Sequence, residues 1–509
     1  MVDQLFQLIQ SLSKTEKRYL RIHASQHVRG DENNYLKLYD AINEQQTYDE
    51  NALVNFLKLD KNKFAVTKNY LYNFILDELI SFHDEKSPQH DLYKQLRQAE
   101  VLYDKHLIEQ AKRIVDKLKK RANDLEDFYL YSRALELEIK MIHLLNNVQE
   151  QVRKIRKLVD ENKEVWRKLQ EIHDYKQLYY MVTCFVLQFG TLNQAEIIQE
   201  IEKLHQNPLL QDPQRATTIT SLNYLYSIQY RYYQMTGNDE EYHLYSQLQV
   251  DLIFANPKIL GYTPLFLLSR LHSLLLACIA TYKFQDFDRN YEYFEKFELQ
   301  TKHEESRWRF IKYNVLLQKY LVYCDFEKAA TLAKEAGKLF INKEVRVSDM
   351  QRTVLLLQSC YLLLIKGEYK IALDYANEIL QEESSNLRGD MYNVVLMFDL
   401  VLHFELRHYQ LLESKIRTAR RYLNNQNSLG EPEAKMFAFF NKAIKTTSNK
   451  ELLILYGELY EELKNLDAQK TPSPIFDFFD LLSWAKAKAE QKTFVAVKIE
   501  QKERIGLLV

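Results

Sequence analysis

The chain has 509 residues, of which 46% are hydrophobic and 27% charged, a balance typical of folded proteins that excludes a wholly disordered chain. The net charge of −1 gives no overall indication of a nucleic acid or an acidic membrane as partner. Only 10 glycines and 8 prolines occur, where average usage for the pair is about 12%. Since helix interiors exclude both residues, this composition predicts an all-α protein.

The first 90 residues, 1–90, are predicted to form a separate N-terminal helical domain. Apolar residues from Leu5 to Leu12 follow the spacing of an amphipathic helix, and Ser13 with Glu16 forms a capping box that begins a second helix. Further helices are expected over 35–44, 50–57 and 63–82. The inward side chains expected on the last of these are Phe64, Tyr70, Leu71, Phe74, Ile75 and Leu79. Residues 83–90, which include Pro88, are predicted to be a linker.

The chain exceeds the roughly 250–300 residues at which single cores stop growing, so two or more domains or a repeat array are expected. Within it, residues 91–470 are predicted to form helices in pairs, on the evidence of repeated turns. The clearest unit begins at Gly367 and continues with an aromatic residue, Tyr369, and the small residues Ala372 and Ala376. Similar turns are expected at about 40-residue intervals. The aromatic positions aligned with Tyr369 are Phe287, Phe326 and Tyr409, and weaker candidates precede them at Ile108, Val148, Leu192 and Asp239.

The unit from Gly367 to Ala376 resembles the turn and second helix of a tetratricopeptide repeat, and the resemblance is specific over about 283–425. The interval exceeds the period of that family, which is about 34 residues, and also fits HEAT-like arrays, but the turn pattern favours the first family. The resemblance implies a right-handed α-solenoid of about eight to nine degenerate hairpins. The opening segment, residues 11–25, also resembles an uncharacterised family of bacterial helical-repeat proteins, and this likeness implies no activity.

Residues 471–509 are predicted to form a C-terminal capping helix and tail. Pro472 and Pro474 interrupt the array, and the aromatic-rich segment 475–488 is expected to be one more helix that covers the last repeat. The final segment, 493–509, is expected to be a strand or a mobile tail. The aromatic helix is also a candidate surface for homo-oligomer formation, which the sequence leaves open.

No catalytic residue, cofactor site or metal site is predicted, and an enzyme with an unfamiliar site is the remote alternative. The sequence lacks phosphate-binding glycine loops, a nucleophile elbow and the HExxH motif. His23 and His27 have the spacing of two metal ligands on a helix, but without an evident third ligand they are interpreted as surface histidines.

Two features of the sequence indicate the cellular compartment of the protein. No apolar run reaches the roughly 20 residues of a membrane helix, and the start of the chain does not have the pattern of a secretory signal. The cysteines are far apart in largely apolar surroundings and are expected to be buried free thiols. The four residues are Cys184, Cys278, Cys324 and Cys360. We therefore expect a cytoplasmic protein that makes no contact with membranes.

Basic clusters support an alternative function, a regulatory protein that binds nucleic acid. The clusters are Lys117, Lys119, Lys120 and Arg121; Arg153, Lys154, Arg156 and Lys157; and Lys415, Arg417, Arg420 and Arg421. Acidic residues lie near each cluster, so solvated helix faces are the competing interpretation. A helix-turn-helix over residues 52–71 would place Lys61, Lys63 and Lys68 on phosphates, although the turn glycine is missing.

The leading hypothesis is a non-catalytic scaffold or adaptor that binds a peptide or protein segment in a concave groove around residues 215–365. Asn223, Ser227, Tyr230, Arg231 and Gln234 share one polar face of a helix. Comparable polar residues, including Gln351, recur on the first helices of later helix pairs. The partner-binding residues predicted on this basis are Asn223, Tyr230, Arg231, Gln234, Arg270, Arg307, Asn314, Gln318, Gln358 and Tyr361. The alternative is that these side chains only form hydrogen bonds between helices or contact solvent.

Overall fold

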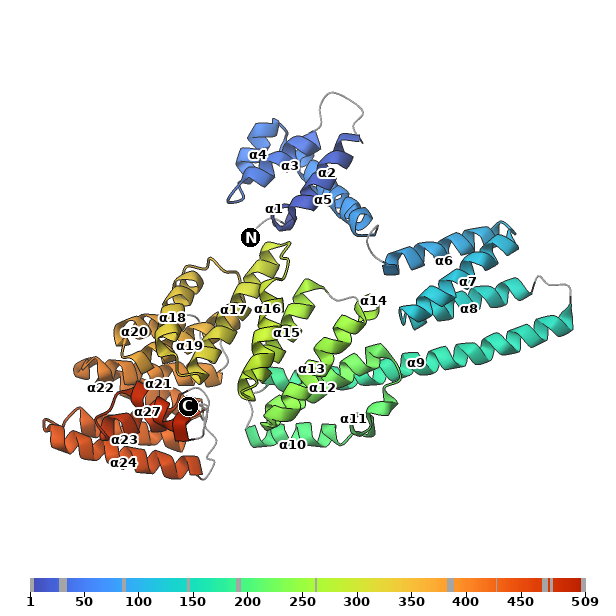
Figure 1. Cartoon of the computed structure of the whole chain (residues 1–509). Coiled ribbons are helices and arrows are strands. Elements are labelled where there is room, and N and C mark those ends of the chain that lie inside the picture. The colour runs from blue at the N-terminus through green and yellow to red at the C-terminus, as the bar shows by residue number, and fades with distance from the viewer. Residues whose placement is uncertain are drawn as a thin grey trace.

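The structure is a computed structural model in which the described elements are helices (Figure 1). The described residues are 4–26, 34–84, 88–143, 147–188, 194–260, 263–381, 389–426, 428–468, 475–476 and 479–504. Among them are 26 α-helices and no strand, which confirms the all-α prediction. Within this described part, no helix combines the length and apolar character needed to cross a lipid bilayer.

Five helices form an N-terminal bundle around a core of their own. They are α1 (Gln4–Ser11), α2 (Lys14–Gln26), α3 (Asn34–Glu44), α4 (Glu50–Leu57) and α5 (Lys61–Asp84). The predicted capping box is present, because the Glu16 N–H donates to Ser13 Oγ at 3.3 Å and the Ser13 N–H donates to Glu16 Oε2 at 2.7 Å. Tyr70, predicted to face inward, is instead 51% exposed, and its ring lies 4.3 Å from that of Tyr35.

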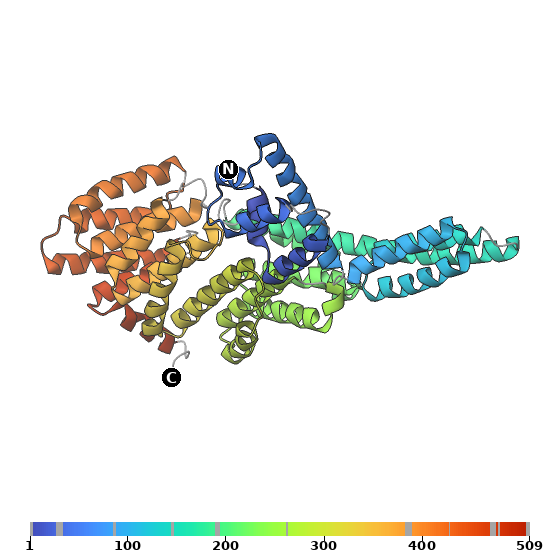
Figure 2. The same cartoon turned by 90° about the horizontal axis from the view of Figure 1, so that it is seen from above.

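Four helices follow, and the first three of them with the first part of the fourth extend away from the rest of the molecule (Figure 2). They are α6 (Pro88–Asp104), α7 (Ile108–Asp124), α8 (Phe128–Ile142) and α9 (Val148–Gln188). The predicted turns at Ile108 and Val148 are helix starts, but α9 is one continuous helix of 41 residues where two shorter helices were expected. No glycine or proline interrupts it. Its first part packs on α8 and its last part on α12, and the turn expected at Leu192 lies outside the described residues.

The remainder of the array packs mostly as consecutive helix pairs. A first segment contains α10 (Gln194–His205), α11 (Pro208–Gln211), a 3₁₀ turn (Pro213–Arg215), α12 (Ile219–Thr236), α13 (Asp239–Ala255) and α14 (Pro257–Leu260). The pairs that follow are α15 (Pro264–Ala280) with α16 (Phe284–Glu295), α17 (Lys302–Val322) with α18 (Phe326–Ile341), α19 (Asp349–Lys366) with α20 (Tyr369–Gln381), α21 (Gly389–Glu405) with α22 (Tyr409–Asn425), and α23 (Glu431–Ala443) with α24 (Asn449–Ala468). One continuous core joins these later pairs. We call α9, α12, α15, α17 and α19 the first-helix layer.

The turns between paired helices share one backbone design. The last helical turn is followed by a residue with positive φ, and the next N–H donates to the carbonyl five residues earlier, the pattern of a Schellman motif. The positive-φ residues in these turns are Gly237, Tyr282, Cys324, Gly367 and Arg407. Most are not glycine, which is how a glycine-poor chain builds this turn repeatedly. The second helices begin two residues later, and α13 accordingly starts at Asp239.

The predicted aromatic register is correct at three turns and wrong at one. Phe326, Tyr369 and Tyr409 are the first residues of α18, α20 and α22. Phe287 is not equivalent to them, because α16 begins at Phe284 and Phe287 is a fully buried residue one turn into that helix. The sequence contains aromatic residues at both positions, so local pattern alone could not choose between them.

Lys343, which follows α18, provides a test of the cost of these non-glycine turns. Its φ is 55°, in the left-handed region where a side chain costs roughly 1–2 kcal/mol. We expect Lys343→Gly to stabilise the protein by about 0.5–1 kcal/mol in urea unfolding, since glycine adopts this conformation without that cost. Lys338→Gly, inside the same helix, should instead destabilise by about 1 kcal/mol. A loss of stability in both variants would contradict this explanation.

The C-terminal segment differs from its prediction in two ways. The helix expected over 475–488 is α26 (Leu481–Ala489), which begins where the Asp480 carboxylate accepts the Ser483 N–H at 2.9 Å. The strand or tail expected from residue 493 is a further helix, α27 (Phe494–Arg504). Pro472, Pro474 and residues 505–509 lie outside the described residues. Helix α26 packs on α24, and α27 reaches back to contact α19.

Candidate functional site

The ten predicted partner-binding residues all lie on the first-helix layer, where four are buried, five are half-buried and one is exposed. Asn223, Tyr230, Arg231 and Gln234 are on α12; Arg270 is on α15; Arg307, Asn314 and Gln318 are on α17; Gln358 and Tyr361 are on α19. Tyr230, Arg270, Asn314 and Tyr361 are buried, and Gln234 alone among the ten is exposed. The four buried side chains among them serve as contacts between neighbouring helices, and the assignment of the set to partner binding stays a prediction.

Asn223 and Gln234 illustrate this at the two ends of α12. The Gln249 side chain on α13 donates to Asn223 Oδ1 at 3.0 Å and also bonds to Ser227 Oγ. Gln234 Nε2 lies 3.4 Å from the hydroxyl of Tyr242, also on α13. Gln351 forms a capping box with Ser348 at the start of α19. These polar groups join or cap helices, as the alternative interpretation of the sequence allowed.

Three arginines form a repeating arrangement that we call the arginine row: Arg231, Arg270 and Arg307. Each guanidinium lies against a hydroxyl on the preceding helix of the layer. Arg231 Nη2 is 3.4 Å from Tyr179 OH on α9, and Arg270 Nη1 donates to Tyr230 OH on α12 at 2.6 Å. Arg307 Nη2 is 3.5 Å from Ser269 Oγ on α15. Tyr179 was missed by sequence reasoning, because only the fold brings α9 beside α12.

The arginine row has no carboxylate partner in the described structure, where no ion pair involves any of the three. Helices α12 and α15 contain no acidic residue at all. By contrast, Arg309 on α17 pairs with Glu305 at 2.6 Å, and Arg352 on α19 pairs with Glu378 at 3.3 Å. The row is thus distinguished from neighbouring arginines by its unbalanced positive charge.

Burial increases the free-energy cost of leaving the positive charge of the arginine row unpaired. Arg270 is only 7% exposed, and its Nε has no hydrogen-bond partner. Burial lowers the pKa of the Arg307 guanidinium. Burial alone would raise the pKa of the Tyr179 phenol, but the guanidinium groups of Arg231 and Arg270 outweigh it, so that this pKa lies below its ordinary value. A tyrosine shifted in this direction indicates a positive local potential.

Beyond the row, neutral hydrogen bonds continue across the layer. His272 Nε2 lies 2.7 Å from Asn314 Oδ1, and Asn314 Nδ2 donates to Gln358 Oε1 at 3.0 Å. Burial lowers the pKa of His272 to about 4, so the ring is neutral near pH 7, and it donates from Nε2 to the asparagine oxygen. This part of the layer is polar without adding positive charge.

A cavity of about 270 Å³ lies at the end of this polar series. Gln318, Gln358 and Tyr361 contribute polar groups to its lining, which is completed by apolar residues of α17 and α19 and by C-terminal residues including Phe479. Tyr361 is buried because the C-terminal segment covers it, with ring centroids of Phe479 and Phe494 at 5.8 and 6.3 Å. Local sequence patterns do not indicate this contact, because Tyr361 and Phe479 are more than a hundred residues apart in the chain.

Five of the twelve residues in the predicted basic clusters form ion pairs in the described structure. Ion pairs involving cluster residues are Lys119 with Glu138 and Glu161, Arg121 with Asp91, Lys154 with Glu150, Lys415 with Asp399, and Arg417 with Glu413. Of the proposed phosphate-contacting lysines near residues 52–71, Lys63 pairs with Asp60 and Lys68 with Glu50. These contacts favour the interpretation as solvated helix faces, because neighbouring carboxylates neutralise the charge that phosphates would need.

The histidine and cysteine predictions have mixed outcomes. His23 lies 3.1 Å from Glu78, while His27 is outside the described residues. Among the residues described, no group of three side chains is arranged to hold a metal ion. Cys278 and Cys360 are buried free thiols as expected, but Cys324 is half-buried and Cys184 is exposed. Cys184 lies two positions after the buried Val182, which places it on the opposite side of α9.

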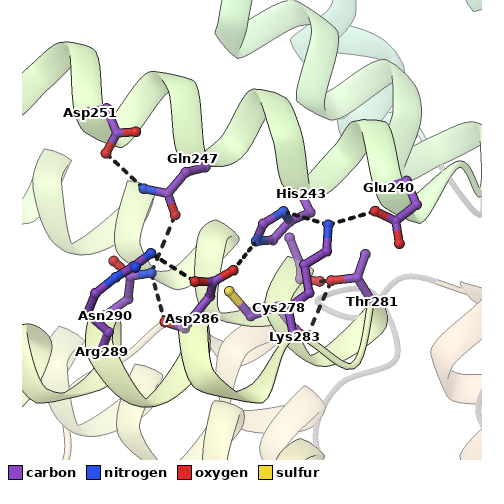
Figure 3. Close-up of polar contacts among 11 residues, drawn as sticks. Glu240, His243, Gln247, Asp251, Cys278, Thr281, Lys283, Asp286, Arg289 and Asn290 are labelled. Atoms are coloured by element: carbon purple, nitrogen blue, oxygen red, sulfur yellow. Dashed lines mark hydrogen bonds and ion pairs between the residues drawn. The ribbon is translucent and has the colours of Figure 1, made fainter.

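A second polar cluster joins α13 to the start of α16 (Figure 3). Lys283 Nζ bonds to Glu240 at 2.6 Å and lies 3.3 Å from Nδ1 of His243, whose Nε2 faces Asp286 at 3.8 Å. Burial, reinforced by Lys283, lowers the pKa of His243. Although Cys278 is nearby, burial raises its thiol pKa to about 12, so it does not supply a thiolate near neutral pH. The arrangement fits a contact between hairpins.

No protein-family model matches the sequence, and no curated protein matches it. Function is therefore argued from the chemistry of the first-helix layer.

Proposed function

We propose that this protein is a non-catalytic scaffold or adaptor, built as a right-handed tetratricopeptide-like α-solenoid, that binds a segment of another protein along its first-helix layer. The observation that carries the proposal is the arginine row. Its members occupy three successive helices of one layer, and each repeats the same contact with the helix before it. Repeated pairing with Schellman turns supports the solenoid, since stacked hairpins present equivalent helices to one side.

The C-terminal helices provide further support, because they already pack on part of the same layer. Phe494 of α27 approaches Tyr361 on α19, and the Lys498 carbonyl lies 3.8 Å from Cys324 Sγ in the turn after α17. Lys502 Nζ lies 3.2 Å from the hydroxyl of Tyr282 in the turn after α15. A helical segment of the chain itself thus contacts these elements, and a partner segment would lie beside it on α12, α15 and α17.

We place the scaffold in the cytoplasm. Cys278 and Cys360 are unpaired thiols inside the core, as is usual for proteins of reducing compartments.

Gln318→Trp tests the scaffold hypothesis by placing a bulky side chain in the lining of the cavity between α17 and α19. Tagged full-length protein would be purified from its native host, and the recovered proteins identified by mass spectrometry. We expect recovery of the specific partner to fall by about tenfold or more in this variant. The matched control is Thr331→Trp, at an exposed position on α18, which should retain the partner.

Circular dichroism and thermal unfolding would show that both variants remain folded. Equal partner recovery from Gln318→Trp and the wild-type protein would exclude the layer around α17 as the binding surface. Recovery of nucleic acid alone, removed by nuclease, would favour the nucleic-acid alternative.

A further inference from the structure

We propose that the arginine row binds the carboxylate side chains of an extended acidic segment in a partner protein. This inference rests on the scaffold function proposed above and specifies the chemistry of the partner. The row offers three guanidinium groups on α12, α15 and α17, and each is held by a neutral hydroxyl.

The need for an anion follows from the charge balance of the layer. Buried or half-buried guanidinium groups are normally paired, because taking a charge out of water is costly unless an opposite charge or full hydrogen bonding compensates it. Arg309 and Arg352 have such partners, but the arginine row has none in the described structure. Arg270 in addition retains a buried Nε without a hydrogen bond. An incoming carboxylate would supply the missing charge.

The same residues favour a carboxylate over a nucleic acid. Proteins that bind single strands stack bases on accessible aromatic faces, but Tyr230 is 4% exposed and its ring is already covered by Arg231 and Arg270. The planar fork of arginine matches a carboxylate in a bidentate geometry, and three separate forks suit three separate acidic side chains.

The layer also sets the spacing of those side chains. Axes of packed helices lie about 8–10 Å apart, and a peptide in the extended polyproline II conformation advances about 3.1 Å per residue with three residues per turn. Acidic residues at every third position would therefore lie on one side of the peptide, about 9 Å apart, and would meet successive arginines. The predicted ligand is an extended segment with Asp or Glu at positions i, i+3 and i+6.

The test uses a fluorescein-labelled synthetic peptide with three glutamates, each separated from the next by two residues drawn from glycine and serine. Binding to the full-length protein would be followed by fluorescence anisotropy at about 20 mM and about 150 mM salt. We expect saturable binding that weakens with salt, and binding about tenfold weaker when the glutamates are replaced by glutamines. A peptide with the three glutamates adjacent should also bind more weakly.

Variants of the row locate the site. Arg231→Gln with Arg307→Gln should weaken binding of the spaced peptide by about tenfold or more, while Arg309→Gln on the same helix α17 should leave it unchanged, because Arg309 already pairs with Glu305. Should the double variant unfold, the wild-type protein still provides the test. The glutamate peptide, and not its glutamine counterpart, should raise the melting temperature and slow hydrogen exchange in α12, α15 and α17.

Three outcomes would overturn the inference. They are equal binding of the glutamate and glutamine peptides, binding unaffected by the double variant when that variant is folded, and tighter row-dependent binding of single-stranded oligothymidine. The two proposals can be told apart. If Gln318→Trp loses a captured partner while the glutamate peptide does not bind the wild-type protein, the scaffold function is supported and the carboxylate-binding site is contradicted. Conversely, row-dependent peptide binding with no partner lost in Gln318→Trp would confirm the anion site and contradict the use of the cavity between α17 and α19 by the partner.

Discussion

Gly337→Ala is expected to destabilise the protein by about 2 kcal/mol or more, although glycine to alanine inside a helix normally stabilises by about 1 kcal/mol. Gly337 lies in α18 where the aromatic ring of Tyr375 on α20 packs directly against its backbone. A Cβ at this position would overlap that ring, and Tyr375 is itself buried with its hydroxyl 3.4 Å from the Lys334 carbonyl. The two helices would have to move apart.

Urea unfolding of two further variants separates this contact from helix propensity. Gly457→Ala, inside α24 with no atom near the added Cβ, should stabilise by about 1 kcal/mol. Combining Gly337→Ala with Tyr375→Leu should cost less than the sum of the two single changes, because the shorter side chain removes the overlap. A stabilising effect of Gly337→Ala would show that α18 and α20 are not in such close contact.

Trp484→Ala is expected to cost about 3–5 kcal/mol and to release the C-terminal helices first. Trp484 is 1% exposed, and its indole Nε1 donates to Glu405 at 2.7 Å. The ring also packs edge-on against Phe439 and Tyr456. Removing it would leave a large cavity between α26 and the last hairpins, in addition to a lost hydrogen bond to a carboxylate.

Denaturant unfolding together with hydrogen exchange in residues 481–504 would measure both parts of this prediction. Trp166→Ala is the matched control, because Trp166 on α9 is 54% exposed and its removal should change stability by less than about 0.5 kcal/mol. If Trp484→Ala costs no more than the control, α26 does not stabilise the end of the array.

The Trp484 prediction also bears on the binding surface. Helix α27 follows α26 directly and covers Tyr361, so release of both helices would expose the ring of Tyr361 and open the cavity beside Gln358. The arginine row lies on earlier helices of the layer. We therefore expect the spaced glutamate peptide to bind the Trp484 variant at temperatures where its array remains folded.

Local features of the sequence determined much of the fold. Helix starts depend on residues close together in the chain, so the capping box at Ser13 and the starts of α18, α20 and α22 were predicted correctly. The scarcity of glycine and proline correctly indicated helices throughout the described chain. The residues of the arginine row were also chosen from sequence, because their spacing places them on comparable faces of successive helices.

Only the tertiary structure decided what those residues contact. Tyr179 reaches Arg231 because the long helix α9 lies beside α12, and Tyr361 is buried because α27 returns to α19 from more than a hundred residues away. Among the described residues, the absence of ion pairs to the row is equally a property of the assembled layer, since acidic residues on the second helices could have pointed toward it. Sequence periodicity specifies which face of a helix is polar, whereas burial and charge balance depend on which helices pack against that face.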